Sequence, residues 1–299
     1  MQSLGNPNSA LLQLRTLLGN LRQPRLTDER FDKAHELFES SSDQQQLILD
    51  WLTAFSIRSE SVDPLSFLSV GCGSGILDNP LIESLSALGR RISYTGIDPN
   101  AIACKRFLDN FRKLQLTDVR LDVQQETVES MRFDQTFDII HAVHSLYYFD
   151  DPAATITRLL LRVCPGGKLL ILQAPKAELN RLADCFWYSN KDMDIWFSER
   201  LEMYLQEVGL AYKKTRINAR VDMTDCFEEQ SADGAMMLDF VTQVDCKALT
   251  QAARELVLGY LTAISQQHGD NVLVSHPVDA FVIDAPSAGQ DGLAQFSQR

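Results

Sequence analysis

Three glycines at alternate positions, Gly71, Gly73 and Gly75, follow an apolar run that ends at Val70. A glycine is needed where the backbone turns sharply or approaches a ligand, because it has no Cβ to stand in the way. The segment therefore predicts a ligand-binding turn after a strand, with Cys72 also among the contacting residues.

The spacing of these glycines separates two kinds of ligand. A dinucleotide-binding turn reads G-x-G-x-x-G, and its last glycine allows close packing of the following helix. Ile76 stands where that last glycine belongs, which counts against a nicotinamide oxidoreductase. The observed G-x-G-x-G resembles the turn of S-adenosylmethionine enzymes.

An acidic residue, Asp98, ends the next apolar run and is followed by Pro99. A carboxylate at the carboxyl end of a strand, beside the switch point of a parallel sheet, can accept hydrogen bonds from ribose hydroxyls. Asp98 could instead cap a helix, because proline is favoured at a first helical position. The two roles are compatible, and Asp98 and Pro99 are both predicted to contact the cofactor.

Two further segments supply polar side chains at strand ends. Glu126 and Thr127 follow the third apolar run, where they could contact an adenine or form only a connecting loop. Val143 and His144 end the fourth run and are followed by aromatic residues. Aromatic rings there could steady a cation by cation–π attraction.

These segments need a sheet that brings the strand ends together. The chain alternates apolar runs with helical patterns, which is typical of a parallel sheet covered on both faces. The predicted strands are 65–70, 92–97, 119–123, 137–143 and 167–173. The clearest intervening helices are 101–114 and 152–163, the second ending at the break Cys164-Pro165-Gly166-Gly167. The predicted fold is α/β and Rossmann-like.

Additional elements flank this sheet. Three helices are predicted before it, one within the Leu-rich stretch 1–21 and two at 28–39 and 42–55. Four more helices are predicted after it, near 179–187, 197–208, 234–244 and 249–265, and the runs 210–217 and 280–285 predict an antiparallel pair at the sheet edge. We interpret 1–60 as a helical cap contributing to a substrate site, 61–175 as the cofactor domain, 176–285 as a substrate-binding region with closing strands, and 286–299 as a polar tail.

Composition limits the partners. The chain has 28 basic and 40 acidic side chains, so its formal net charge is −12, which disfavours a nucleic-acid substrate. A negative surface can also serve solubility alone. The six cysteines form no C-x-x-C pair, and no metal site is predicted. No run has the apolar length of a membrane span, so no membrane partner and a cytoplasmic location are expected.

Over residues 65–150 the four segments, in this order, resemble a class I methyltransferase. The resemblance is sharpest to the histamine N-methyltransferase family, at Ile140–Tyr148, Asp222–Phe227 and Leu238–Thr242. It implies S-adenosylmethionine as cofactor. The residues that carry over to the cofactor side are Gly71, Gly73, Gly75, Asp98, Glu126, Thr127 and Val143, with Cys72, Pro99 and His144 beside them.

On the substrate side, three polar residues of this chain differ from those of the family. Gln44 stands where the family has an acidic residue, His144 where it has a glutamine, and His276 where it has an asparagine. We predict catalytic roles for these three, as holders of the acceptor or as a base, since imidazole titrates near neutral pH. Each histidine could equally be an ordinary hydrogen-bonded side chain.

The chain keeps the aromatic residues that line the family's substrate pocket. The resemblance places Tyr147, Tyr148 and Phe240 in the substrate pocket, together with Cys226. It predicts N-methylation of a small amine or imidazole by a monomer or homodimer. The changed polar residues leave two alternatives open: O-methylation of a phenol or carboxylate, and a cofactor-binding partner protein without turnover.

Overall fold

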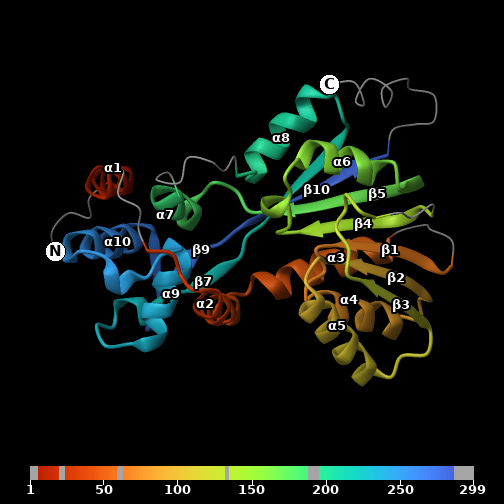
Figure 1. Cartoon of the computed structure of the whole chain (residues 1–299), viewed down its shortest axis with the longest axis horizontal. Coiled ribbons are helices and arrows are strands. Elements are labelled where there is room, and N and C mark those ends of the chain that lie inside the picture. Colours follow the sequence, from red (N-terminus) through yellow and green to blue (C-terminus); the bar gives the residue numbers. More distant parts are fainter. Residues whose placement is uncertain (1–5, 20–23, 59–62, 132–134, 188–194, 286–299) are drawn as a thin grey trace. The chain divides into compact units, whose positions relative to one another are not determined.

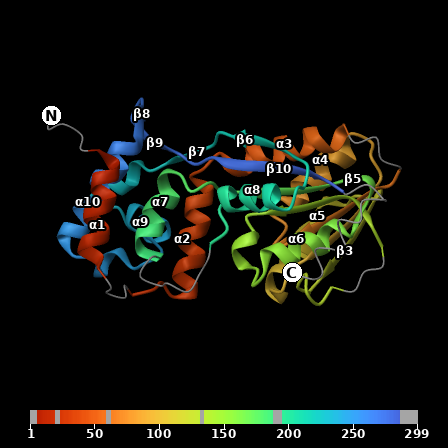
Figure 2. The same ribbon diagram turned by 90° about the horizontal axis from the view of Figure 1, so that it is seen from above.

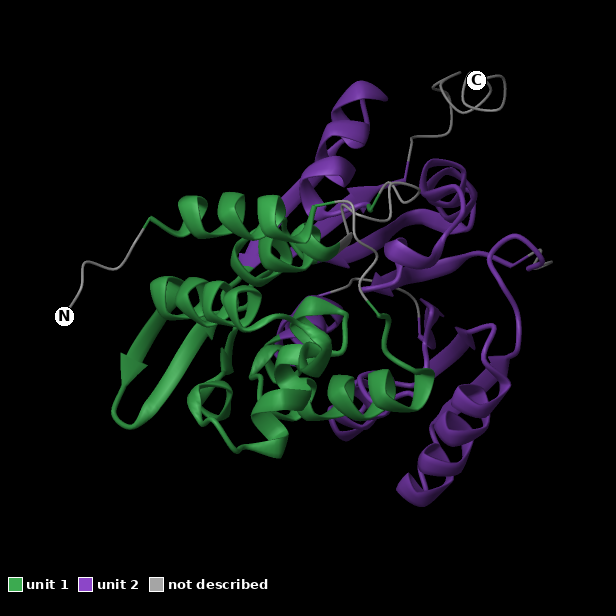
Figure 3. Ribbon diagram, turned by 60° about the vertical axis from the view of Figure 1, so that its left-hand side comes forward, with its two compact units in different colours: residues 1–47, 174–195, 217–278 green, residues 48–173, 196–216, 279–299 purple. Residues whose placement is uncertain are grey.

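The computed structural model describes residues 6–19, 24–58, 63–131, 135–187 and 195–285. The chain divides into two compact units that each combine separate stretches of sequence (Figure 3). Unit 1 contains 1–47, 174–195 and 217–278, and unit 2 contains 48–173, 196–216 and 279–299.

Unit 2 is built on a seven-stranded sheet (Figure 1). Its strands are β1 (Leu65–Val70), β2 (Ile92–Ile97), β3 (Val119–Gln124), β4 (Phe137–Val143), β5 (Val163–Gln173), β6 (Tyr212–Ile217) and β10 (Val278–Asp284). Their order is β3-β2-β1-β4-β5-β10-β6. The first five are parallel, and β10 is antiparallel to β5. The predicted Rossmann-like fold with antiparallel edge strands is confirmed, and β10 and β6 lie side by side in Figure 2.

Helices cover both faces of this sheet. They are α3 (Gln44–Ile57, beginning in unit 1), α4 (Asp78–Ala87), α5 (Ala101–Leu114), α6 (Pro152–Leu160) and α8 (Ser198–Glu207), with a short 3-10 helix η1 (Leu146–Tyr148). Leu68 and Ile140 face a core completed by α6 and α8, whereas Tyr94 faces α4 and α5 through Asp78 and Phe107 (Figure 1). Alternate residues of each strand therefore supply the two cores.

The predicted helix 152–163 and the break after it require correction. The helix ends at Leu160, and Cys164–Gly167 lie within β5 instead of between the helix and the strand. β5 pairs Val163 with Phe137 and then skips to Lys168, so the intervening residues form a bulge. A Cβ on Gly167 would lie 2.7 Å from the Asp138 carbonyl oxygen, so this irregular pairing accommodates a Pro-Gly-Gly sequence.

Unit 1 is mainly helical. Its elements are α1 (Pro7–Leu18), α2 (Asp28–Ser40), α7 (Glu178–Trp187), α9 (Ala232–Thr242), α10 (Gln251–Ile264), the 3-10 helices η2 (Thr224–Phe227) and η3 (Cys246–Ala248), and strands β7 (Arg220–Asp222), β8 (Ser265–His268) and β9 (Asn271–Ser275). The predicted helices are confirmed with small changes in their ends. The sheet β7-β9-β8 was not predicted, because Ser265–His268 contains no apolar residue to mark it as a strand.

The predicted functional division of the chain stays a prediction. The segment 1–60 is shared between the units, which separate after Leu47, and the segment 176–285 contributes to both. The predicted polar tail lies outside the described residues. Among the helices that the structure describes, none is long and apolar enough to cross a membrane.

A fully buried carboxylate, Asp279, ties three elements of unit 2 together. Arg216 on β6 donates to both of its oxygens, at 2.7 and 2.9 Å, and Ser198 at the start of α8 donates at 2.7 Å. Burial alone would raise the pKa of Asp279, but the hydrogen bonds from Arg216 and Ser198 and the charge of Lys214 hold it below its usual value. The folded protein therefore stabilises the charged form of Asp279.

We expect Asp279→Asn to lower the free energy of unfolding by about 3 kcal/mol at pH 7, because it removes one partner of a buried ion pair. Since the folded pKa is lowered, this contribution is present above the unfolded value of about 3.9 and disappears as the pH falls through the folded value. Urea unfolding of both proteins across this pH range measures the difference.

Asp284→Asn is the matched control on the same strand. Asp284 pairs with Lys168 at 2.6 Å, but its side chain is 54% exposed. Exposed ion pairs contribute about 1 kcal/mol or less, so this variant should stay close to wild type. Equal losses in the two variants would contradict the assigned role of Asp279.

Candidate functional site

The glycine turn after β1 has the backbone conformation that its sequence predicted. Gly71, Gly73 and Gly75 have φ of 71°, 53° and 70°, a region that favours glycine. A Cβ on Gly75 would lie 2.3 Å from the ring of Phe107, whereas a Cβ on Gly73 would meet nothing within 4 Å. Packing against Phe107 therefore requires a glycine at position 75, whereas the space that a Cβ on Gly73 would occupy is empty of protein atoms.

Asp98, beyond the end of β2, has its carboxylate fixed by two backbone donors. Its Oδ2 accepts from Gly73 N–H at 2.9 Å and its Oδ1 from Asn100 N–H at 2.8 Å. The cap of α5 is Asn100, whose side chain accepts from two amides of the first turn, so Asp98 is not the N-cap. Pro99 is exposed beside it. The glycine turn and the acidic residue thus form one hydrogen-bonded unit.

The third predicted segment follows β3 at the same end of the sheet. Ser130 donates to Glu126 Oε2 at 3.1 Å, and the Thr127 and Ser130 hydroxyl oxygens lie 3.2 Å apart. Thr127 is exposed. The segment is an ordered polar turn, and its predicted contact with adenine stays a prediction.

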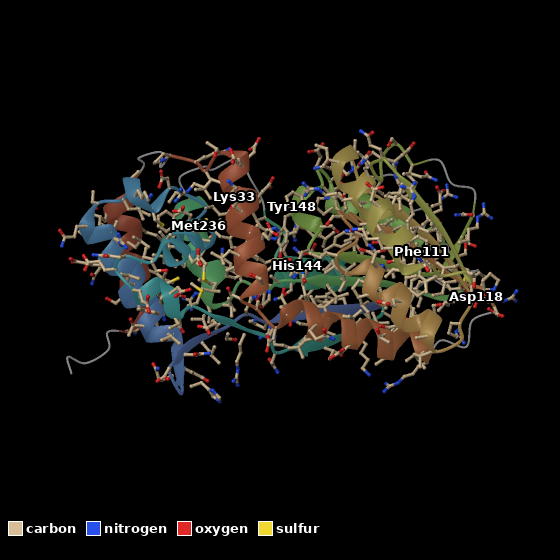
Figure 4. The ribbon with its side chains drawn as sticks, turned by 90° about the horizontal axis from the view of Figure 1, so that it is seen from below. Lys33, Phe111, Asp118, His144, Tyr148 and Met236 are labelled. Atoms are coloured by element: carbon tan, nitrogen blue, oxygen red, sulfur yellow. The ribbon has the colours of Figure 1, made fainter. Side chains whose placement is uncertain are left out.

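The fourth segment follows β4. Val143 is partly buried, and His144 has a φ of 49° while its N–H donates to Leu172 O at 2.9 Å. The His144 and Tyr147 rings are stacked with centroids 6.4 Å apart, and Tyr148 is 78% exposed. Figure 4 labels His144 and Tyr148 beyond this end of the sheet and Asp118 at the opposite end.

Below the glycine turn lies a buried polar network. The Tyr94 hydroxyl donates to Asp78 Oδ1 at 2.5 Å and lies 2.7 Å from His141 Nε2. Burial raises the pKa of Tyr94 and lowers that of His141, so both are neutral near pH 7. Cys72 is also buried, its thiol pKa raised by burial, and its sulfur lies 2.9 Å from where a Cβ on Gly96 would stand. The thiol thus packs inside the unit, and its predicted cofactor contact stays a prediction.

Two observations test whether this end of the sheet fits a cofactor. A Cβ on Gly71 would lie 2.9 Å from Ser145 Cβ, so the turn closes tightly on the residue after His144. The Ser145 hydroxyl is buried and has no hydrogen-bond partner. The turn is thus closed at Ser145, whereas the anchored Asp98 carboxylate and the open space beside Gly73 fit a ligand at the carboxyl ends of β1 and β2. No group of three or more metal-ligating side chains occurs among the described residues.

Unit 1 gathers three of the predicted substrate-side residues. Gln44 is buried and donates from Nε2 to His276 O at 2.7 Å. The His276 ring lies edge-on to Phe38 with centroids 4.9 Å apart, and its Nδ1 is 3.2 Å from Ser42 Oγ. Phe38 in turn contacts Phe240, with centroids 4.6 Å apart. We call Gln44, His276, Phe38 and Phe240 the unit 1 cluster.

The sequence analysis missed the α2 side of this cluster. His35 lies 5.2 Å from the Phe240 ring and 6.0 Å from the Phe31 ring, centroid to centroid. A hydrogen bond with Glu39 raises the pKa of His35 despite its partial burial. Phe31, His35 and Phe38 are spaced four and three residues apart, so their common helix face was recoverable from the sequence.

Cys226 lies in the interior of unit 1. It is 2% exposed, its sulfur is 3.6 Å from Gly234 O, and burial raises its pKa to about 12. This environment is that of a packed, unreactive thiol. Its predicted contact with substrate stays a prediction.

The strand order, the glycine turn and the anchored carboxylate are the features of a Rossmann-like fold, in which ligands bind beyond the carboxyl ends of the strands. Residues 40–215, more than half of the chain, match the methyltransferase domain family. The chain therefore belongs to the methyltransferase domain family.

Curated relatives agree with the predicted resemblance. Histamine N-methyltransferase of Danio rerio is 25% identical over 243 residues, covering 72% of this chain and 80% of the relative. Histamine N-methyltransferase A of Xenopus laevis is 24% identical over the same length and coverage. The predicted resemblance to class I methyltransferases and to this family is confirmed.

Solved structures support the fold. The YcgJ protein of Bacillus subtilis has a TM-score of 0.51 at 17% identity, covering 80% of this chain and 98% of its own. The plantazolicin methyltransferase BpumL, solved with S-adenosylhomocysteine (SAH), has a TM-score of 0.51 at 13% identity, covering 94% of this chain and 100% of its own. At these identities the likeness concerns the fold alone.

We expect Gly75→Ala to lower the free energy of unfolding by about 3 kcal/mol, because both its φ and its contact with Phe107 oppose a Cβ. Gly73→Ala has the positive φ but open space, so its loss should be about 1 kcal/mol. Urea unfolding of the two variants gives the comparison. A larger loss for Gly73→Ala would contradict the packing assigned to the turn.

Proposed function

We propose that the protein is an S-adenosylmethionine-dependent methyltransferase that methylates a nitrogen atom of a small amine or imidazole. The observation that carries the cofactor assignment is the Asp98 carboxylate, fixed by the N–H groups of Gly73 and Asn100 beside the glycine turn. The family membership and the histamine N-methyltransferase relatives support the reaction and the nitrogen acceptor.

Each part of the unit 2 site has a role in this proposal. Asp98 holds the ribose hydroxyls, while Gly71 and Gly73 let the backbone approach the ligand. Bound cofactor supplies an electrophilic methyl group on a sulfonium centre. The protein then has to align the acceptor and exclude water, and positioning alone can supply a large part of the rate increase.

We propose that the unit 1 cluster recognises an amine or imidazole and, as a separate proposal about unit 2, that His144 orients an acceptor or removes its proton. The Gln44 side chain is fixed by the His276 carbonyl, and the rings of Phe38 and Phe240 pack together. Aromatic faces attract an amine through cation–π contact, and a fixed amide distinguishes hydrogen-bonding partners. An imidazole base matches an acceptor that titrates near neutral pH.

O-methylation of a phenol or carboxylate is the second candidate. It is favoured by Gln44 itself, which is neutral where an amine would be better held by an acidic side chain. Screening amines, imidazoles, phenols and carboxylic acids with the same enzyme preparation separates the two candidates. Turnover confined to the oxygen acceptors would exclude the nitrogen proposal.

We expect calorimetric titration to give micromolar affinity, about −8 kcal/mol, for S-adenosylmethionine and SAH and no binding of NADH. Asp98→Asn should weaken both sulfur ligands by roughly tenfold to a hundredfold, because a charged acceptor is lost. Asp118→Asn is the control, since Asp118 is an exposed acid at the opposite end of the sheet (Figure 4). Absence of binding by the wild-type chain would exclude the proposed cofactor.

We expect His144→Asn to reduce kcat about a hundredfold, because the base or orienting group is lost while asparagine still suits a positive φ. His268→Ala, in the exposed hairpin of unit 1, should leave kcat unchanged. Steady-state kinetics with the best acceptor from the screen measures both. Unchanged kcat and KM in His144→Asn would remove His144 from the proposed site.

A further inference from the structure

Three buried polar side chains of unit 2 meet beneath the glycine turn. Tyr94 comes from β2, His141 from β4 and Asp78 from the start of α4, and each is at most 4% exposed. β1 lies between β2 and β4 in the sheet, so the contact between Tyr94 and His141 spans it. The three side chains therefore link the two strands that flank the turn to the helix that follows it.

The geometry fixes the direction of each hydrogen bond in this network. A tyrosine hydroxyl has one proton, which Asp78 Oδ1 accepts from Tyr94 at 2.5 Å. The Tyr94 oxygen then accepts from Nε2–H of His141 at 2.7 Å. Burial lowers the pKa of His141, which agrees with a neutral ring that donates from this nitrogen. The Tyr94 hydroxyl is thus the central member, and Asp78 Oδ1 and His141 Nε2 are 3.7 Å apart.

A network of this kind is costly in a protein core. A buried carboxylate loses its hydration, and apolar residues of similar volume often give equal or greater stability. What a fully connected network provides instead is a single arrangement, because each member has to keep its partners. Here the element held in a single arrangement is the first turn of α4.

The start of α4 has no capping side chain. Leu77 occupies the N-cap position and makes no side-chain hydrogen bond, and Asp78 is the first residue of the helix. Asp78 therefore holds this end of the helix against the sheet through its bond with Tyr94. The glycine turn ends at the same point, because Gly75 O accepts from Asn79 N–H at 2.8 Å.

The other end of the turn is held from β2. The N–H groups of Gly71 and Cys72 both donate to Ile97 O, at 2.9 and 3.1 Å, and Gly73 N–H donates to Asp98. The backbone that would approach the cofactor thus runs between two supports. One support is the end of β2, and the other is the start of α4.

We propose that Asp78, Tyr94 and His141 are positioning residues that hold the glycine turn in the shape that receives the cofactor. They act through the backbone of the turn and the first turn of α4, and none of them has to touch the ligand. S-adenosylmethionine and SAH differ only in the transferred methyl group, so a displaced turn weakens both. This inference rests on the proposed cofactor site.

Tyr94→Phe tests the proposal, because it removes the central hydroxyl and keeps the ring that stacks on Phe67. It leaves Asp78 and His141 without their shared partner. Calorimetric titration should show the affinities for S-adenosylmethionine and SAH both falling about tenfold. In the ligand-free protein, amide hydrogen exchange of residues 71–81 should become faster, which reports on the turn without any ligand.

Tyr260→Phe is the matched control, with the same chemical change in unit 1. Tyr260 is also 1% exposed, and its hydroxyl donates to Glu178 O at 2.8 Å. Both variants should melt at a lower temperature than wild type, because each loses a hydrogen bond of a buried hydroxyl. In Tyr260→Phe, however, both affinities should stay within about twofold of wild type, and exchange of residues 71–81 should be unchanged.

Asp78→Asn is the milder second variant at the network. An amide oxygen still accepts from Tyr94, but the bond is no longer charge-assisted, so we expect both ligands to bind about threefold more weakly. The double variant Asp78→Asn/Tyr94→Phe should bind about as weakly as Tyr94→Phe alone. The two changes affect the same bond, so their effects should not add.

The outcomes separate this inference from the function on which it rests. Weaker binding of both ligands and faster exchange of the turn in Tyr94→Phe, but not in Tyr260→Phe, support the proposal. Wild-type affinities at a lowered melting temperature, or losses that simply add in the double variant, would overturn it and leave the cofactor assignment intact. If Tyr94→Phe does not fold, wild-type affinity in Asp78→Asn overturns it. If the wild-type chain binds neither ligand, the proposed function fails, and the exchange comparison still shows whether the network holds the turn.

Discussion

The pairing of β1 between β2 and β4 is the constraint on which the candidate site depends. In register, Val70 lies beside Ile97 on one side and Ala142 on the other, so three chain segments leave the sheet at the same level. The segments that follow contain Gly71, Asp98 and His144. Because side chains alternate between faces, a slip of one residue in either pairing would also exchange the two cores. The requirement for burial therefore fixes the placement of the site.

Within this frame the site is organised by backbone groups more than by side chains. The Asp98 carboxylate accepts from two main-chain N–H groups, and His144 donates its own N–H to Leu172 O. Gly73 and His144, whose N–H groups make two of these bonds, both have a positive φ. For His144, which is not a glycine, this conformation costs free energy that the packed sheet must offset. The unsatisfied Ser145 hydroxyl is a second departure from the most stable arrangement at the same place.

Much of unit 2 was predictable from the sequence because its signals are local. Apolar runs marked β1 and β2, and the glycine spacing and Asp98 marked the turn. Features set by other segments were missed: the bulge at Cys164–Gly167 depends on its pairing with β4, and Asn100 caps α5 although Asp98 and Pro99 offered a plausible local cap. Ser145 gave no signal, because a lack of hydrogen-bond partners is visible only in the fold.

The acceptor side illustrates why a resemblance specifies a cofactor better than a substrate. Gln44, Phe240 and His276 are far apart in the sequence and lie in unit 1, where main-chain hydrogen bonds hold the segments of Gln44 and His276. Asp43 N–H donates to Arg220 O at 3.1 Å, and His276 N–H donates to Ala219 O at 2.8 Å, so the start of β7 aligns the segments of Gln44 and His276. These bonds do not depend on the side chains that they position. Substitution of the Gln44 or His276 side chain therefore leaves these main-chain bonds in place, whereas a Cβ on Gly75 would overlap the ring of Phe107.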